Sequence, residues 1–266
     1  MAELIERIAE LKAQGIQFCI VTVVDTKGAT PRKAGARAVV FENGRAEGTV
    51  GGGAIEVVAF QKAVEILKTG APSLIHYKLD QLEQAAMICG GEMTIFYEPV
   101  YPEKIVTIFG GGHVGRAVAQ VASVAGWKVR VIDEREGALD PAAFPNNSSL
   151  VAQPYIEFID KQTFDRYDWL VIVTPKHKHD ESILERVVDC SARYIGMMGS
   201  PRKVAEIKQN LAQKGIDIDQ RANIFTPIGL NIGVETPGEI AVAIVGEMLS
   251  IAHQREKIHS CSKPGP

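Results

Sequence analysis

The sequence has few cysteines, no long apolar run and no strong excess of charge. Its four cysteines, at positions 19, 89, 190 and 261, show neither CxxC spacing nor the density of a disulfide scaffold, so we expect reduced thiols and a cytoplasmic protein. No stretch reaches the roughly 18 apolar residues of a spanning helix, and the amino-terminal segment lacks a signal peptide's apolar run, so we expect no membrane insertion. A net charge of −3 gives no global attraction to nucleic acid, and any anion site must be local.

Two hydrophobic patterns divide the chain. Residues 1–102 mix a helical period, glycine-rich loops and strand-like runs, which predicts a smaller N-terminal α+β domain. After a segment with two prolines, short β-branched runs alternate with helix-compatible segments over residues 103–253. This alternation predicts an α/β fold with a Rossmann-type, doubly wound parallel sheet. We expect residues 254–266 to form a disordered tail.

A GxGxxG motif formed by Gly110, Gly112 and Gly115 leaves an apolar strand and opens an amphipathic helix. The next strand ends at Asp133, near the spacing at which an acid meets a ribose hydroxyl. This context predicts a dinucleotide pocket that also includes His113, with free helix N–H groups facing a phosphate. Asp133 favours a free 2′-hydroxyl and Arg135 would offset that preference, so NAD, NADP and other phosphorylated ligands all stay open.

Two N-terminal segments have the chemistry of an anion site. The segment "GATPRKAGAR" places three cations among small residues, which suits an oxyanion but also describes a solvated basic turn. The segment "GTVGGGAIE" puts three glycines at a helix entry, where they would either present N–H groups to an anion or allow close backbone packing. The candidate residues are Thr30, Arg32, Lys33 and Arg37 in the first segment and Gly51, Gly52 and Gly53 in the second.

Cys89 directly precedes Gly90 and Gly91, which remove side-chain cover from one flank. A lone cysteine is usually a buried filler, and Cys19 and Cys190 both fit that description. A thiolate is also a soft donor for a metal, provided that nearby cations lower its pKa. We therefore treat Cys89 as a hypothetical metal contact.

Two polar loops follow strands of the predicted sheet. In "TPKHKHD", His177, His179 and Asp180 could be metal ligands, a general acid/base pair, or a polar loop in which Asp180 caps the next helix. At the following strand-to-helix turn, Ser200, Arg202 and Lys203 are helix-cap residues or anion donors.

These motifs, in this order from about residue 16 to 250, resemble the XdhC/CoxI family of molybdenum-hydroxylase accessory factors. The resemblance implies a protein that binds molybdenum cofactor (molybdopterin) and helps to mature and insert it into a xanthine dehydrogenase type apoenzyme. It further implies a homodimer and an insertion factor rather than a classical turnover enzyme, with Cys89 as a possible molybdenum contact. Pro175 stands where many members have a histidine, and Ala29, Asn231 and Gly238 also depart from the family pattern.

The Rossmann half alone also fits two other classes of protein. One is an NAD(P)-dependent oxidoreductase of a small substrate, and the other is a nucleotide-sensing regulator without turnover. The anion-binding features of the N-terminal half favour the accessory protein over both.

Overall fold

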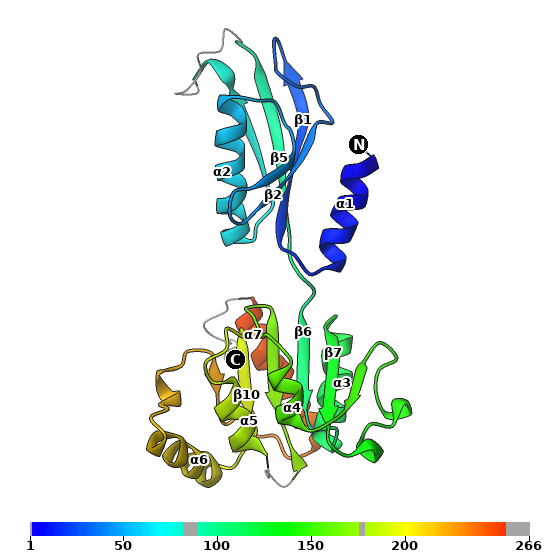
Figure 1. The fold of residues 1–266 in the computed structure, drawn as a ribbon, viewed down its shortest axis with the longest axis vertical. Helices are drawn as coiled ribbons and strands as arrows, with labels where there is room; N and C mark the ends of the chain where they lie inside the picture. The colour runs from blue at the N-terminus through cyan, green and yellow to red at the C-terminus, as the bar shows by residue number, and fades with distance from the viewer. Residues whose placement is uncertain (1, 82–89, 176–178, 254–266) are drawn as a thin grey trace, which may run out of the picture. The chain divides into compact units, whose positions relative to one another are not determined.

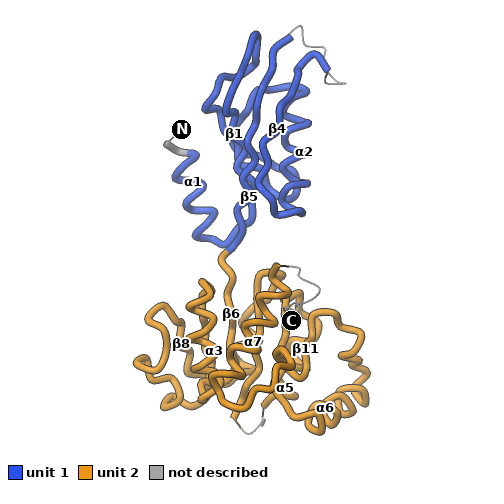
Figure 2. Tube along the Cα trace, turned by 180° about the vertical axis from the view of Figure 1, so that it is seen from behind, with its two compact units in different colours: residues 1–102 blue, residues 103–266 orange. Residues whose placement is uncertain are grey.

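The computed structural model describes residues 2–81, 90–175 and 179–253, and the chain forms two compact units, residues 1–102 and 103–266 (Figure 2). Some residues singled out by the sequence lie outside the described residues: Cys89, His177 and the tail 254–266, which includes Cys261. In the described part, no helix is both long and apolar enough to cross a membrane.

The first unit is an antiparallel sheet with one helix on each face (Figure 1). Its strand order is β3-β2-β1-β5-β4. The elements are α1 (Ala2–Ala13), β1 (Phe18–Lys27), β2 (Arg37–Phe41), β3 (Ala46–Gly48), α2 (Ala54–Thr69), β4 (Ser73–Lys78) and β5 (Glu92–Val100).

Alternation along β1 explains why two helices are needed. Cys19, Val21 and Val23 point into the core beneath α2, whereas Phe18 packs with Leu11 of α1 on the opposite face. Successive side chains of a strand point to opposite sides, so a strand that is apolar throughout must be covered on both. The continuous apolar run of the first strand is therefore consistent with a sheet buried on both faces.

The second unit is a parallel six-stranded sheet in the order β11-β10-β9-β6-β7-β8. The strands are β6 (Ile105–Phe109), β7 (Lys128–Asp133), β8 (Ser149–Ala152), β9 (Asp168–Ile172), β10 (Tyr194–Met197) and β11 (Ile224–Phe225). The helices are α3 (His113–Val124), α4 (Tyr155–Asp160), α5 (Asp180–Val187), α6 (Pro201–Gln213) and α7 (Pro237–Ala252).

This strand order is that of a dinucleotide-binding Rossmann fold, which confirms the predicted fold class. The chain runs outward from β6 through β7 to β8, and then returns to add β9, β10 and β11 on the other side of β6. The direction of winding thus reverses between β6 and β9, and ligands of open α/β sheets bind outside the strand ends at such a reversal.

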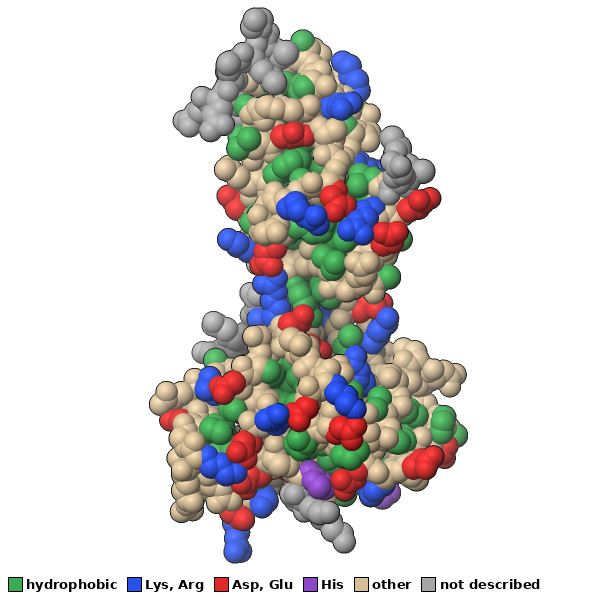
Figure 3. Space-filling view, viewed as in Figure 1, with side chains coloured by type: hydrophobic (Ala, Val, Ile, Leu, Met, Phe, Trp, Pro, Cys, Tyr) green, Lys and Arg blue, Asp and Glu red, His purple; other side chains and the backbone are tan. Residues whose placement is uncertain are grey.

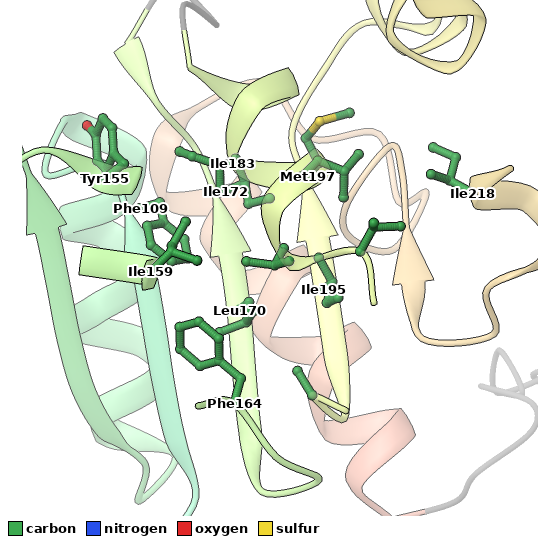
Figure 4. Close-up of a cluster of buried hydrophobic side chains, with 14 of the residues drawn as sticks. Phe109, Tyr155, Ile159, Phe164, Leu170, Ile172, Ile183, Ile195, Met197 and Ile218 are labelled. Carbon is green, nitrogen blue, oxygen red and sulfur yellow. The ribbon is translucent and has the colours of Figure 1, made fainter. Parts of the chain in front are cut away.

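Apolar side chains on both faces of the parallel sheet hold its strands in place. Phe109, Ile172 and Met197 lie on neighbouring strands and face α4 and α5, as Figure 4 shows. On the other face, α3 and α7 pack over Val106, Val171 and their neighbours. The two buried tryptophans of the chain, Trp127 and Trp169, belong to this second core, with ring centroids 4.6 Å apart.

The element boundaries agree with the hydrophobic pattern except at short or polar pieces. Strand β1 continues to Lys27 and so includes the first three residues of segment 25–37, which the sequence predicts to be a loop. The three-residue β3 and the two-residue β11 carry too few side chains to show a period and were not predicted. The sequence TPGE at residues 236–239 predicts a capping box at the start of α7. The structure confirms it, because Thr236 accepts from the Glu239 N–H and Glu239 accepts from the Thr236 N–H.

We expect the substitution Thr236→Ala to lower the free energy of unfolding of the second unit by about 1 kcal/mol, because it removes one half of this capping box. Tryptophan fluorescence during urea denaturation measures it, since both tryptophans lie in the second unit. Thr163→Ala, at an exposed threonine outside any helix, serves as the control. Equal denaturation midpoints for the two variants would contradict the role of the cap.

Candidate functional site

Two glycines of the GxGxxG motif are required by the packing of backbone on backbone. A Cβ at Gly115 would lie 1.9 Å from the Gly110 carbonyl oxygen, and one at Gly110, whose φ is 121°, would lie 2.4 Å from the Val173 carbonyl oxygen. Real Cβ atoms do not approach this closely. These two glycines seat α3 on the end of β6 next to β9, so they are explained without any ligand.

Gly112 differs, because no atom of the described residues lies within 4 Å of the Cβ it lacks. Its φ of −74° and ψ of −170° are open to any residue, so neither packing nor backbone conformation requires glycine here. It is the N-cap of α3 and provides no side-chain cap, which leaves helix N–H groups directed outward. An open approach to free N–H groups is what a phosphate group needs.

A pocket of about 540 Å³ opens at this point, at the carboxyl ends of β6, β7 and β9. Its lining includes Gly111, Gly112, His113, Arg116, Arg135, Thr174 and Met198. Arg116 is held by the chain itself, since its guanidinium donates to the carbonyl oxygens of Gly111 and Ala138, each at 3.1 Å. The His113 side chain is exposed at the start of α3. Of the residues predicted for this site, Gly112, His113 and Arg135 line the pocket, whereas Gly110, Gly115 and Asp133 do not.

Asp133, at the end of β7, is fully buried and already saturated with hydrogen bonds. It accepts from the Gly111 N–H at 2.8 Å, from the Arg135 N–H at 2.9 Å, and from the Arg135 guanidinium at 2.9 and 2.8 Å on its two oxygens. Burial opposes the charge, but the hydrogen bonds from Arg135 and Gly111 outweigh it and lower the pKa of Asp133. The carboxylate is thus ionised at neutral pH and engaged within the protein.

The loop after β9 is organised by Asp180, which is buried at the first residue of α5. Its carboxylate accepts from the Thr174 hydroxyl at 2.5 Å and from the Thr174 N–H at 3.3 Å. The N-cap position belongs to His179, not to Asp180 as the capping interpretation held. The His179 ring in turn lies 3.1 Å from a Glu134 oxygen. Neither His179 nor Asp180 lines the pocket at the glycine motif. His177, the third member of this loop motif, lies outside the described residues.

Ser200, Arg202 and Lys203 stand at the start of α6. Ser200 is the N-cap and accepts from the Lys203 N–H at 3.3 Å, while the Lys203 ammonium lies 3.4 Å from Glu206. Arg202 is exposed and has no ion-pair partner among the described residues. None of the three lines the pocket at the glycine motif, and capping accounts for Ser200.

In the first unit, Glu56 shapes the glycine-rich turn before α2. Its carboxylate accepts from the Thr49 hydroxyl at 2.5 Å and from the Val50 N–H at 3.2 Å, and the Thr49 oxygen accepts from the Gly51 N–H at 3.2 Å. Gly53 is the N-cap of α2 without a side-chain cap, and its φ is 63°. The Glu56 carboxylate therefore holds the turn from the side of its own helix. The first N–H groups of α2 have no side-chain cap and stay available to a ligand.

Three segments predicted separately from the sequence meet beside this turn. A Cβ at Gly51 would lie 3.0 Å from the Pro31 ring, and a Cβ at Gly91 would lie 2.2 Å from the Ala29 carbonyl oxygen and 2.9 Å from the Thr30 methyl group. Segment 28–31 thus contacts both the turn at Gly51 and Gly91, the residue before β5. We call these three segments the N-terminal glycine cluster. Cys89 itself lies outside the described residues.

Cations near the N-terminal glycine cluster have no carboxylate partner. Arg32, Lys33 and Arg37 are exposed and form no ion pair among the described residues. Elsewhere charges of both signs are interspersed over each unit, as Figure 3 shows, and many are paired, for example Arg186 with Asp160 and Arg221 with Asp189. Unpaired cations beside outward N–H groups form a local positive site in a chain with a net negative charge.

The described residues hold no group of three histidine, cysteine or acidic side chains placed to bind a metal ion. Cys19 is buried, which raises its pKa to about 12, and burial also raises the pKa of Cys190. Cys19 is therefore a core residue, as predicted, and Cys190 is partly buried and packs against the core of the second unit. The metal contact proposed for Cys89 stays a prediction.

Sequence reasoning missed several residues that build these sites. From its place in the first helical turn, Glu56 is expected only to favour the helix dipole, whereas its carboxylate accepts from the turn before its own helix. Its signal is the threonine seven residues earlier, which is too weak to detect in one sequence. Arg116 and Tyr155 gave no signal, because their contacts join segments that are distant along the chain.

The fold and the pocket define a Rossmann-type protein with a second α+β unit, and comparison with known families identifies it. Residues 106–248 match the XdhC Rossmann domain, and residues 11–78 match the XdhC and CoxI family. The chain therefore belongs to the XdhC family.

Three curated relatives are similar over much of the chain. The uncharacterised protein YqeB of Escherichia coli is 29% identical over 91% of this chain and 45% of its own length. A probable xanthine dehydrogenase subunit of Bacillus subtilis is 28% identical over 58% of this chain and 45% of its own length. The molybdenum cofactor insertion chaperone PaoD of Escherichia coli is 23% identical over 92% of this chain and 86% of its own length. The chain spans about half the length of the first two.

A solved structure has the same fold. The crystal structure of a xanthine dehydrogenase from Bacillus halodurans aligns with a TM-score of 0.52 and 20% identity, covering 97% of this chain and 98% of that one. At this identity the likeness establishes the fold alone.

We expect Gly112→Ala to leave the second unit folded and to weaken nucleotide binding about tenfold or more, because the added methyl group occupies the approach to the N–H groups of α3. Gly115→Ala should instead lower stability by roughly 1–3 kcal/mol or more, because its Cβ collides with backbone. Tryptophan fluorescence measures stability, and calorimetric titration with ADP measures binding. Unchanged ADP affinity in Gly112→Ala would argue against a phosphate at this turn.

The N-terminal glycine cluster gives a matched pair of variants. Gly91→Ala should lower the free energy of unfolding of the first unit by roughly 1–3 kcal/mol or more, because its Cβ would meet the Ala29 carbonyl. Gly90→Ala should be tolerated, since nothing in the described part of the chain lies within 4 Å of the added Cβ. Hydrogen exchange of β1 and β5 amides, read by mass spectrometry, measures both. Similar protection in the two variants would show that the contact does not stabilise the cluster.

Proposed function

We propose that this protein binds molybdenum cofactor as cargo and assists its maturation and insertion into a molybdenum hydroxylase of the xanthine dehydrogenase type. Membership of the XdhC family supports an accessory role. The relative named as a molybdenum cofactor insertion chaperone matches 92% of the chain and 86% of its own length, so the likeness covers residues of both units. The proposal includes a cytoplasmic homodimer, as the family resemblance implies.

The observation that carries the proposal is the convergence of three segments in the first unit. The N-terminal glycine cluster joins the segment around Thr30, the turn Gly51 to Gly53 and Gly91. It has N–H groups at the start of α2 without a side-chain cap, and the adjoining Arg32 has no carboxylate partner among the described residues. The exposed cations and the N–H groups before α2 are not part of the hydrophobic cores beneath α2 and α1, so those cores do not explain them. A site with spare donors and positive charge suits an anionic guest.

The chemistry of the cargo fits these residues. A molybdopterin carries a terminal phosphate, a polar pterin and a metal centre, and the cluster supplies N–H groups and a guanidinium for the first two. We assign the phosphate to the N–H groups before α2 with Arg32. The two glycines after Cys89 leave its flank without side chains, and we assign the metal contact to this thiol.

Turnover of a small substrate is less well supported. The acid/base pair expected from the sequence is His177 with Asp180, and His177 lies outside the described residues. In the described structure Asp180 accepts from Thr174, and the neighbouring His179 lies beside Glu134. Neither side chain lines the pocket at the glycine motif. We therefore propose that this pocket binds a nucleotide with a structural or regulatory role, and that no reaction is catalysed there.

Arg32→Gln should reduce the retention of released molybdenum cofactor about tenfold and lower activation of an apo-hydroxylase in parallel, because it removes a charge-assisted hydrogen bond. Lys68→Gln, at the opposite end of α2 from Gly53, is the matched control and should change neither quantity. Cofactor is measured by its fluorescent oxidation product after gel filtration.

Cys89→Ser should lower cofactor retention while leaving ADP binding to the second unit unchanged. If both Arg32→Gln and Cys89→Ser retain cofactor and activate the hydroxylase as well as the wild-type protein does, the first unit is not the cargo site.

A further inference from the structure

The hydrogen bonds of Asp133 help to decide between NAD and NADP, which the glycine motif alone does not distinguish. A free acid at the end of this strand would accept from the hydroxyl groups of a ribose. Here the two oxygens of Asp133 instead accept from the Gly111 N–H and from the forked guanidinium of Arg135. A ribose could reach this carboxylate only by breaking a bidentate, charge-assisted pair.

Arg135 is placed to meet a phosphate. Its side chain is 51% exposed although its partner Asp133 is fully buried, and it lines the same pocket as Gly111 and Gly112. The neighbouring guanidinium of Arg116 is engaged by two carbonyl oxygens, so among the described lining residues Arg135 is the arginine that a ligand can reach. A guanidinium binds a phosphate through two parallel hydrogen bonds.

Tyr155 lies next to this pair and supplies a replacement donor. It is 2% exposed, and within the described structure its hydroxyl has no hydrogen-bond partner. Burial, followed by the charge of Asp133, raises its pKa, so the hydroxyl keeps its proton. When Arg135 turns toward a ligand, this O–H can donate to Asp133 and satisfy the carboxylate.

We propose that the pocket of the second unit selects dinucleotides with a phosphate on the adenosine ribose, as in NADP(H), over those with a free 2′-hydroxyl, as in NAD(H), and that Arg135 decides this selectivity. Asp133 is then a positioning residue: it holds the glycine turn, and it keeps Arg135 at the pocket until a phosphate draws the guanidinium away. The inference concerns the nucleotide alone and does not depend on the molybdenum role.

Fluorescence titration of the full chain with NADPH and NADH tests it. The wild-type protein should bind NADPH about tenfold more tightly than NADH. Arg135→Gln should bring the ratio of the two affinities to about one by weakening NADPH alone. Arg186→Gln, which breaks an exposed arginine–aspartate pair outside this pocket, is the control and should keep the ratio. If Arg135→Gln does not fold, Arg135→Lys replaces it and should keep only part of the preference.

Asp133→Asn separates the two assignments of this residue. If Asp133 only positions Arg135, the variant keeps its preference for NADPH. A variant that loses NADH binding alone would make Asp133 the ribose ligand and overturn the proposal. Equal affinities in the wild-type protein, tighter binding of NADH, no binding of either nucleotide, or an unchanged ratio in Arg135→Gln would each overturn it as well.

Discussion

Backbone contact at Gly115 is the constraint on which the second unit depends. Helix α3 can lie against the end of β6 only because no side chain separates Gly115 from the Gly110 carbonyl. This seating directs the first turn of α3 to the point where the sheet reverses its winding, and it brings the Gly111 N–H to Asp133. The position of the pocket and of its charged residues therefore depends on one close backbone contact, which any residue larger than glycine would prevent.

The first unit solves a similar problem with different means. Its glycine-rich turn is held by an acidic side chain, Glu56, from the helix that the turn introduces, and by the packing of Gly91 on Ala29. In both units a carboxylate accepts backbone N–H groups of a glycine turn from the protein side. The remaining N–H groups are then free on the outer side, where an anion can bind them.

The sequence predicted the long elements well because their apolar periods are strong. The parallel strands, the capping box at Thr236 and the glycine motif with its helix could all be identified from local pattern. Contacts between distant segments could not be predicted, since the hydrogen bonds of Arg116 to Ala138 and the approach of Gly91 to Ala29 have no local signature. Asp180 shows the same limit, because its buried bond to Thr174 resembles a helix cap in the sequence alone.

The packing of two cysteines in or against the hydrophobic cores also affects how the protein can be examined chemically. Cys19 and Cys190 both have raised pKa values, so at neutral pH they offer almost no thiolate to an electrophile. Mass-spectrometric mapping of iodoacetamide adducts on the native protein would therefore carry little background from either one. Modification at position 89 can then be followed separately, with and without a bound guest, in the otherwise unaltered chain.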